Sequence, residues 1–123
     1  MKHPDSLLLY VADTAKTAEF FHRLFEIPVV EQSVNFAMLV SPTGWALGLW
    51  ARHDVKPAPQ AGAGGVELMV TLDSVAAVDE ALVQAKALNA PVLQSPVHLD
   101  FGYTFLVGSP DGHFVRVFHP ASA

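Results

Sequence analysis

The chain has 123 residues, 51% of them hydrophobic, which is enough to build one compact domain or two half-domains sharing a core. Twelve acidic against seven scattered basic residues give a net charge of −5, which argues against nucleic acid or an anionic membrane as partner. The absence of cysteine excludes a disulfide, a thiolate zinc site and a cysteine nucleophile. The polar N-terminus and the short Leu7–Ala12 run carry no targeting or membrane signal, so we expect a cytoplasmic protein.

The first half of the chain predicts a strand, a helix and three further strands. Asp13 or Thr14 can cap the helix, and Pro28 stops it. Alternation along the last two strands separates an aliphatic face from a face with aromatic and small residues. The predicted elements are a strand at Ser6–Val11, a helix ending near Phe25, a short edge strand at Val29–Gln32, and strands at Phe36–Val40 and Trp45–Trp50.

A stretch rich in Pro, Gly and Ala follows at Ala51–Gly65 and has no hydrophobic period. It divides the chain into a first unit at residues 1–53, a connecting segment at 54–65 and a second unit at 66–123. Two interpretations of this stretch remain, a plain linker and a mobile lid, and we favour the linker.

The second half predicts the same order of elements. Asp73 or Ser74 can cap its helix, and Ser109-Pro110-Asp111-Gly112 is a typical hairpin turn. The predicted elements are a strand at Val66–Leu72, a helix ending near Leu88, a strand at Pro91–Val97, and a hairpin of Tyr103–Val107 with His113–His119.

The two halves also match each other in sequence. LVSPTGWALGLW at residues 39–50 matches LVGSPDGHFVRVF at residues 106–118 if one residue is inserted before the turn. The match predicts an internal duplication of a βαβββ unit. We therefore expect an α+β fold in which the two units form a cupped mixed sheet with the helices on its outer face.

The strand faces turned away from the helices should line a concave, mostly apolar surface, as small-molecule sites do. Leu8, Tyr10, Ala46 and Thr71 are assigned to this surface as surrounding positions. The residues expected to contact a ligand are Ser6, Phe36, Met38, Gly48, Trp50, Glu67, Met69, Tyr103, Phe105, Phe114, Arg116 and Phe118.

Paired βαβββ units ending in SPDGHFVRVFHP resemble the vicinal oxygen chelate superfamily, which includes glyoxalase I, extradiol dioxygenases and bleomycin-resistance proteins. The resemblance covers nearly the whole chain. Within the superfamily, the aromatic face and FGYTFLVGSPDGHFVRVF are most similar to the antibiotic-binding, phenazine-resistance branch.

The resemblance also implies where a divalent metal would be held in the enzymes of the superfamily. The corresponding positions in this chain are Ser6, Gly48, Glu67 and Arg116. Glycine has no donor atom and arginine is a permanent cation, so we expect no metal and no cofactor. Ser6 and Gly48 would then leave room for a flat ligand. Glu67 and Arg116 form either a structural ion pair or a pair whose Arg116 also binds a ligand carboxylate.

These observations favour a non-enzymatic protein that binds and sequesters a planar aromatic compound, such as a phenazine- or bleomycin-like antibiotic. The alternatives are a metal-dependent lyase, isomerase or dioxygenase of the same superfamily, or a subunit with a regulatory role. The resemblance further implies a two-fold homodimer, with the concave site built within one chain or across the dimer.

Overall fold

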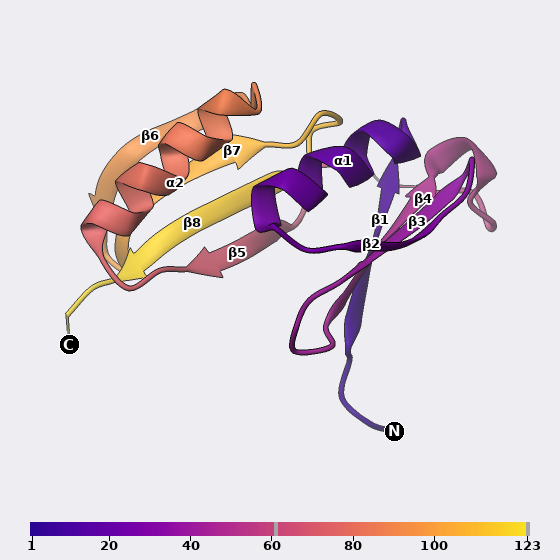
Figure 1. Cartoon of the computed structure of the whole chain (residues 1–123), viewed down its shortest axis with the longest axis horizontal. Helices are drawn as coiled ribbons and strands as arrows, with labels where there is room; N and C mark the ends of the chain where they lie inside the picture. The colour runs from indigo at the N-terminus through magenta and orange to yellow at the C-terminus, as the bar shows by residue number, and fades with distance from the viewer. Residues whose placement is uncertain (61, 123) are drawn as a thin grey trace. The chain divides into compact units, whose positions relative to one another are not determined.

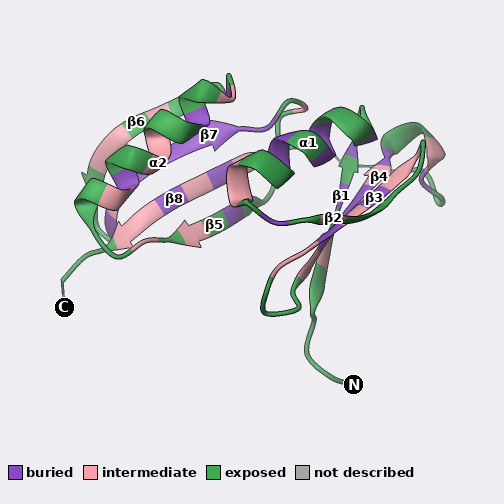
Figure 2. Cartoon of the chain, in the orientation of Figure 1, coloured by how far each residue is buried: buried purple, intermediate pink, exposed green. Residues whose placement is uncertain are grey.

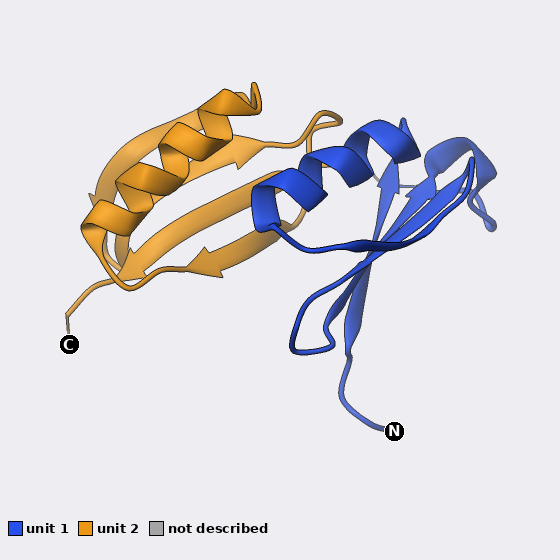
Figure 3. Cartoon of the chain, in the orientation of Figure 1, with its two compact units in different colours: residues 1–62 blue, residues 63–123 orange. Residues whose placement is uncertain are grey.

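The computed structural model describes residues 1–60 and 62–122, and the chain divides into two compact units. We call Met1–Gly62 unit 1 and Ala63–Ala123 unit 2 (Figure 3). No α-helix among the described residues is long and apolar enough to cross a membrane.

Unit 1 contains one four-stranded mixed sheet with one helix along it (Figure 1). The strand order is β1-β4-β3-β2, in which β1 and β4 are parallel and the other neighbours are antiparallel. The elements are β1 (Ser6–Val11), α1 (Thr14–Phe25), β2 (Val29–Gln32), β3 (Phe36–Val40), β4 (Ala46–Ala51) and a 3₁₀ turn, η1 (Arg52–Asp54).

Unit 2 repeats this architecture with the strand order β5-β8-β7-β6, and its parallel pair is β5 with β8. The elements are β5 (Glu67–Thr71), α2 (Val75–Ala87), β6 (Val92–Leu99), β7 (Gly102–Gly108) and β8 (Phe114–Pro120). The predicted α+β class and the duplicated βαβββ units are therefore confirmed, with a separate four-stranded sheet in each unit.

Both helices begin at side-chain caps, and each cap is one of the two candidates that the sequence offers. Asp13 accepts a hydrogen bond from the backbone N–H of Lys16 at 3.0 Å, and Ser74 accepts one from Ala77 at 3.0 Å. Each cap satisfies a backbone donor that the first helical turn leaves without an intrahelical partner. Helix α1 ends at Phe25, and its C-cap Glu26, two residues before Pro28, has a left-handed φ of 55°.

Each helix buries one face of its own sheet, and these faces form the cores (Figure 2). In unit 1, Phe21 of α1 is fully buried together with Leu39, Leu47 and Leu49 of the sheet. The buried core residues of unit 2 include Val78 and Ala85 of α2 and Phe105, Val107 and Val115 of the sheet. Burial of a large aliphatic or aromatic side chain contributes about 1.5–3 kcal/mol, so these faces stabilise the units.

The two hairpin turns are built alike and show that no residue is inserted before the second one. Ser41 and Ser109 each accept, through the side chain, a bond from the backbone N–H four positions later. The strand pairs that flank the turns are Val40 with Ala46 and Gly108 with Phe114, so five residues lie between them in both units. The predicted one-residue insertion is wrong.

Because the hairpin of unit 2 has no inserted residue, the residues of β7 that share a face differ from those predicted. Tyr103 and Phe105 pair with His119 and Val117, on the face that α2 covers. Thr104 pairs with Phe118 and lies on the opposite face. The sequence predicts Tyr103 and Phe105 on the opposite face, and this prediction is wrong because a one-residue slip moves every side chain of a strand to the other side.

The first part of the predicted connecting segment packs against unit 1. The indole N–H of Trp50 donates to Asp54 Oδ2 at 2.9 Å, and Val55 is buried. Asp54 is the last residue of η1, and the backbone N–H of Val55 donates to the carbonyl oxygen of Arg52 at 3.4 Å, so this part of the segment is held by β4 and η1. Residue 61, which the same prediction includes, lies outside the described residues.

We expect Gly102→Ala to destabilise the protein by at least about 2 kcal/mol. Gly102 has a φ of +149°, and an added Cβ would overlap the carbonyl oxygen of His119 on the paired strand. Gly65→Ala is the control, because a Cβ there meets no described heavy atom within 4 Å. Urea unfolding of both variants measures the difference, and equal midpoints would contradict this account of Gly102.

Candidate functional site

Each sheet has a face that the helix of its own unit does not cover, and we call it the open face. On the open face of unit 1, Leu8 and Tyr10 alternate with the buried Leu9 and Val11, and they are 43% and 39% exposed. The other residues of this face, by strand register, include Ser6, Phe36, Met38, Val40, Ala46, Gly48 and Trp50, with the exposed Glu31 of β2 opposite Met38. Apart from Ser6 and Glu31, these residues are apolar or aromatic, as the sequence predicts.

Trp50 lies at the centre of the aromatic part of this face. In the strand register it is directly opposite Tyr10 on β1 and Phe36 on β3. Its indole N–H is held by Asp54, which η1 places four residues further along the chain. A hydrogen bond to a carboxylate fixes the ring orientation and leaves the apolar ring surface for contact with another group.

The volume next to the backbone of Gly48 is occupied by neighbouring side chains. A Cβ there would lie 2.9 Å from Leu8 Cδ1 and 3.7 Å from the ring of Phe36. The expectation that Gly48 leaves room for a ligand is therefore wrong in this arrangement, because Leu8 and Phe36 fill that volume. A flat compound would have to lie over these side chains, not against the Gly48 backbone.

The open face of unit 2 is more polar and is organised around Arg116 of β8. Its guanidinium donates to Glu67 through Nε (2.7 Å to Oε1) and Nη2 (3.1 Å to Oε2). Nη1 donates to Gln94 Oε1 at 3.0 Å and to Thr104 Oγ1 at 3.3 Å. Thr104 in turn donates to the carbonyl of Val117 at 2.8 Å. The bidentate pair with Glu67 is the strong, charge-assisted kind.

Aromatic residues border this network. The ring of Phe101 meets that of Phe118 edge to face, with centroids 5.7 Å apart, and the Arg116 guanidinium carbon lies 5.8 Å from the Phe101 centroid. Strict alternation along β7 would turn Phe101 toward α2, but the positive φ of Gly102 interrupts the alternation. The remaining residues of this open face are Met69, Thr71, Leu106 and Phe114.

Two predicted ligand contacts lie instead on the helix side of unit 2. The hydroxyl of Tyr103 donates to Asp79 of α2 at 2.7 Å, and this hydrogen bond raises the pKa of the phenol above its usual value. Phe105 is fully buried in the core. The assignment of Tyr103 and Phe105 to the ligand face is therefore corrected.

Three residues around Arg116 were not predicted from the sequence, namely Thr104, Gln94 and Phe101. An ungapped match of the two units, at an offset of 68 residues, pairs Phe36 with Thr104 and would have found the first. Gln94 was hidden because the pairing of β6 with β7 is irregular on either side of it. Phe101 was hidden because it precedes the predicted strand.

The donor atoms at the four positions of the superfamily metal site do not fit a divalent ion. In unit 1, Ser6 offers a hydroxyl that donates to Asp5, and Gly48 has no side-chain donor atom. In unit 2, both carboxylate oxygens of Glu67 accept bonds from the cation Arg116. The described residues contain no group of three or more His, Asp or Glu placed to hold a metal.

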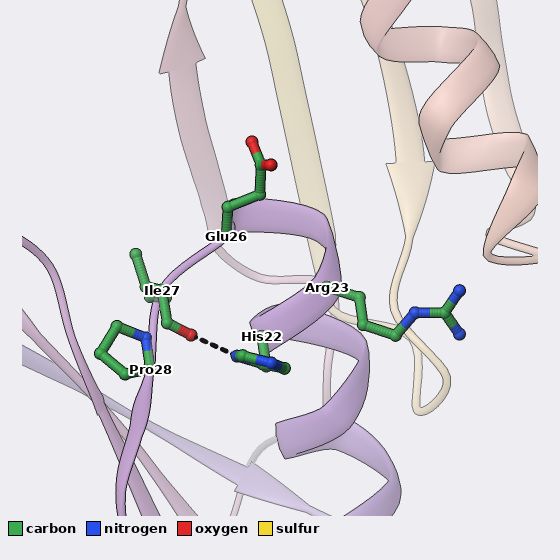
Figure 4. A pocket seen from close by; sticks show the side chains of 5 residues that line it. All are labelled: His22, Arg23, Glu26, Ile27 and Pro28. Carbon is green, nitrogen blue, oxygen red and sulfur yellow. Dashed lines mark hydrogen bonds between the residues drawn. The ribbon is translucent and has the colours of Figure 1, made fainter.

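A shallow depression lies elsewhere in unit 1, at the end of α1 (Figure 4). It is lined by His22, Arg23, Glu26, Ile27 and Pro28. His22 Nδ1 is 2.7 Å from the carbonyl oxygen of Ile27, while the charged groups of Arg23 and Glu26 point in different directions in Figure 4. The depression has no converging charged groups, so we do not assign a site to it.

The fold and the two open faces define a class of protein, the duplicated βαβββ proteins of the vicinal oxygen chelate type. Residues 3–117 match the family described as Glyoxalase/Bleomycin resistance protein/Dioxygenase superfamily. The chain belongs to this family, and the resemblance seen in the sequence is confirmed.

Three relatives illustrate the range of similar proteins. Protein ATC0852 from Agrobacterium tumefaciens, solved by NMR, is 38% identical with a TM-score of 0.91, covering 99% of this chain and all of that one. The phenazine antibiotic resistance protein EhpR of Enterobacter agglomerans is 24% identical over 116 residues, covering 93% of this chain and 89% of EhpR. A lactoylglutathione lyase from A. tumefaciens is 22% identical with a TM-score of 0.73, covering 97% and 94% of the two chains, and shares the fold.

We expect Arg116→Ala to destabilise the protein by about 1–3 kcal/mol, since Glu67, Gln94 and Thr104 all lose a donor. The double variant Glu67→Gln with Arg116→Met should recover much of this loss, because it leaves no unpaired charge. Urea unfolding measures both variants, with Arg23→Ala on the exposed side of α1 as control. If the double variant is no more stable than Arg116→Ala, then Glu67 and Arg116 do not compensate each other's charge as proposed.

We also predict that the purified protein holds no stoichiometric Zn, Ni, Fe or Mn. The reason is the donor set at Ser6, Gly48, Glu67 and Arg116, which offers one carboxylate already paired with a cation. Elemental analysis tests the prediction, and chelators should leave the thermal midpoint unchanged. One molar equivalent of metal that is lost in Glu67→Gln would refute it.

Proposed function

We propose that this chain is a metal-independent binding protein that sequesters a planar aromatic compound, of the phenazine type. The observation that carries the proposal is Trp50, whose indole is fixed by Asp54 on an apolar open face. A rigidly held aromatic ring loses little conformational freedom when a flat ligand stacks on it, so most of the contact energy is kept.

The composition of the open face of unit 1 supports a flat, apolar ligand. Tyr10, Phe36 and Trp50 are neighbours in the strand register, and Leu8 and Met38 are placed beside them. Aromatic pairs in offset or edge-to-face contact contribute about 0.5–1.5 kcal/mol beyond the area they bury. Leu8 and Tyr10 are exposed and the other three residues are half-buried, and an accessible apolar set of this kind in a single face is typical of ligand or protein contact surfaces.

The similarity to EhpR supports the phenazine class, since that protein is a phenazine antibiotic resistance protein. The enzyme alternative, a metal-dependent lyase or dioxygenase, requires donor atoms that Ser6, Gly48, Glu67 and Arg116 do not supply. Binding without chemistry is the function that this donor set supports best.

Trp50→Ala should weaken binding of phenazine by about 1–3 kcal/mol, as expected for a central aromatic anchor. Calorimetric titration measures this loss directly, with Trp45→Ala as the control. Trp45 precedes β4 in the turn and is 38% exposed, so its removal should leave the affinity unchanged.

A Trp45→Phe variant leaves Trp50 as the single tryptophan and lets its fluorescence report on binding. Stacking on the indole should quench this emission in proportion to site occupancy. If neither phenazine nor any other planar aromatic compound quenches Trp50, the binding proposal is refuted.

We further propose that the protein acts as a homodimer in the cytoplasm. In the sheets of the described residues, β1 and β2 of unit 1 and β5 and β6 of unit 2 are outer strands with a strand neighbour on one side. Soluble proteins usually protect such edges, and a two-fold dimer is the commonest way of doing so between copies. Sedimentation at micromolar concentration should give twice the mass of the chain, and a monomer would count against the dimer.

A further inference from the structure

We infer that the open face of unit 2 selects planar aromatic compounds that carry a cationic or hydrogen-bond-donating group, with Glu67 as the recognising residue. The inference rests on the proposed function, the binding of planar aromatic compounds, and adds the open face of unit 2 as a second surface that such compounds would contact. It replaces the possibility, raised from the sequence, that Arg116 recognises a ligand carboxylate.

Arg116 has little donor capacity left for an acidic ligand. A guanidinium has five N–H groups, and Arg116 uses at least four of them in its bonds to Glu67, Gln94 and Thr104. Its side chain is also only 15% exposed. A ligand carboxylate would have to displace one of these partners and would meet the charge of Glu67 beside it.

Glu67, by contrast, has hydrogen-bond acceptor capacity that Arg116 does not use. Arg116 takes one acceptor position on each carboxylate oxygen, whereas an ionised carboxylate offers about four such positions. The Glu67 side chain is 35% exposed, more than twice the exposure of its partner. The part of this ion pair that a solute can reach is therefore its negative half.

Apolar surface for an aromatic ring is available in the same face. Met69, two residues along β5 from Glu67, is 60% exposed, and Phe101 is 42% exposed. Phe101 is held by its contacts with Phe118 and Arg116, so its position relative to the ion pair is defined. A flat ring could lie on these apolar side chains while a substituent reaches the carboxylate.

The charge of the unit favours the same class of ligand. Six acidic residues of unit 2 stand against two basic ones, Lys86 and Arg116, so most of the net charge of −5 belongs to this half of the chain. A negative local potential attracts cations and repels anions, most strongly at low ionic strength. Because five of these six acidic residues lie on α2 or in turns, the charge of the unit adds a long-range attraction for a small aromatic cation, and Glu67 supplies the local contact.

The test uses three compounds with one ring system, namely 9-aminoacridine, acridine and acridine-9-carboxylate, titrated by calorimetry at low salt. The wild type should bind 9-aminoacridine about tenfold more tightly than acridine, as a charge-assisted hydrogen bond at a partly exposed group allows. It should bind the carboxylate more weakly than acridine.

Three variants identify the recognising group. Glu67→Gln should reverse the order in favour of the carboxylate, because the charge of Arg116 is then uncompensated. Glu67→Gln with Arg116→Met should abolish the discrimination while acridine still binds. Glu80→Gln, which removes the same charge from an exposed position on α2, should keep the wild-type order.

The outcomes separate this inference from the proposed function. If none of the three acridines binds, the proposed function fails and the inference falls with it. If all three bind the wild type equally, or the carboxylate binds best, the inference is overturned while the proposed function stands. Retention of the 9-aminoacridine preference in the double variant would also overturn the role of Glu67.

Discussion

A four-stranded sheet has two faces. Within the described residues each unit supplies one α-helix, which can cover one of these faces and leaves the other open. The helix-covered face takes the aliphatic residues and becomes the core, as Leu47, Leu49 and Val115 show. The open face is released from the demands of helix packing, so its residues can be selected for other purposes. Both candidate surfaces of this protein are consequences of that arrangement.

The two open faces have diverged although their backbones correspond. Gly48 and Arg116 occupy the same place in the repeated hairpin, 68 residues apart. In unit 1 the place is covered by Leu8 and Phe36, which leaves an apolar surface around Trp50. In unit 2 the side chain of Arg116 draws Glu67, Gln94 and Thr104 into one polar network. The fold thus presents one apolar and one charged surface on equivalent sheets.

Much of this organisation could be predicted from the sequence, because alternation, helix caps and turn residues are local signals. The duplication and the strand faces of unit 1 were predicted correctly, and Asp13 and Ser74 were each one of two candidate caps. The error at Tyr103 and Phe105 came from one inserted residue in the comparison of the two hairpins, and strand geometry turned that slip into a change of face. Gln94 and Phe101 depend on irregular strand pairing and on the backbone of Gly102, which no periodic pattern reports.

The strand pairings of unit 2 also differ in the length of the loop that each one closes. In unit 2 the hairpin pair Gly108 and Phe114 is six positions apart in sequence, whereas the parallel pair Glu67 and Phe114 is 47 apart. The entropy lost on closing a loop grows with its length, so pairing β5 with β8 costs more than closing the hairpin. The bond between Glu67 and Arg116 joins β5 to β8 and therefore closes the longer loop. The residue assigned to ligand recognition thus also holds together the pairing that is entropically the more costly of the two.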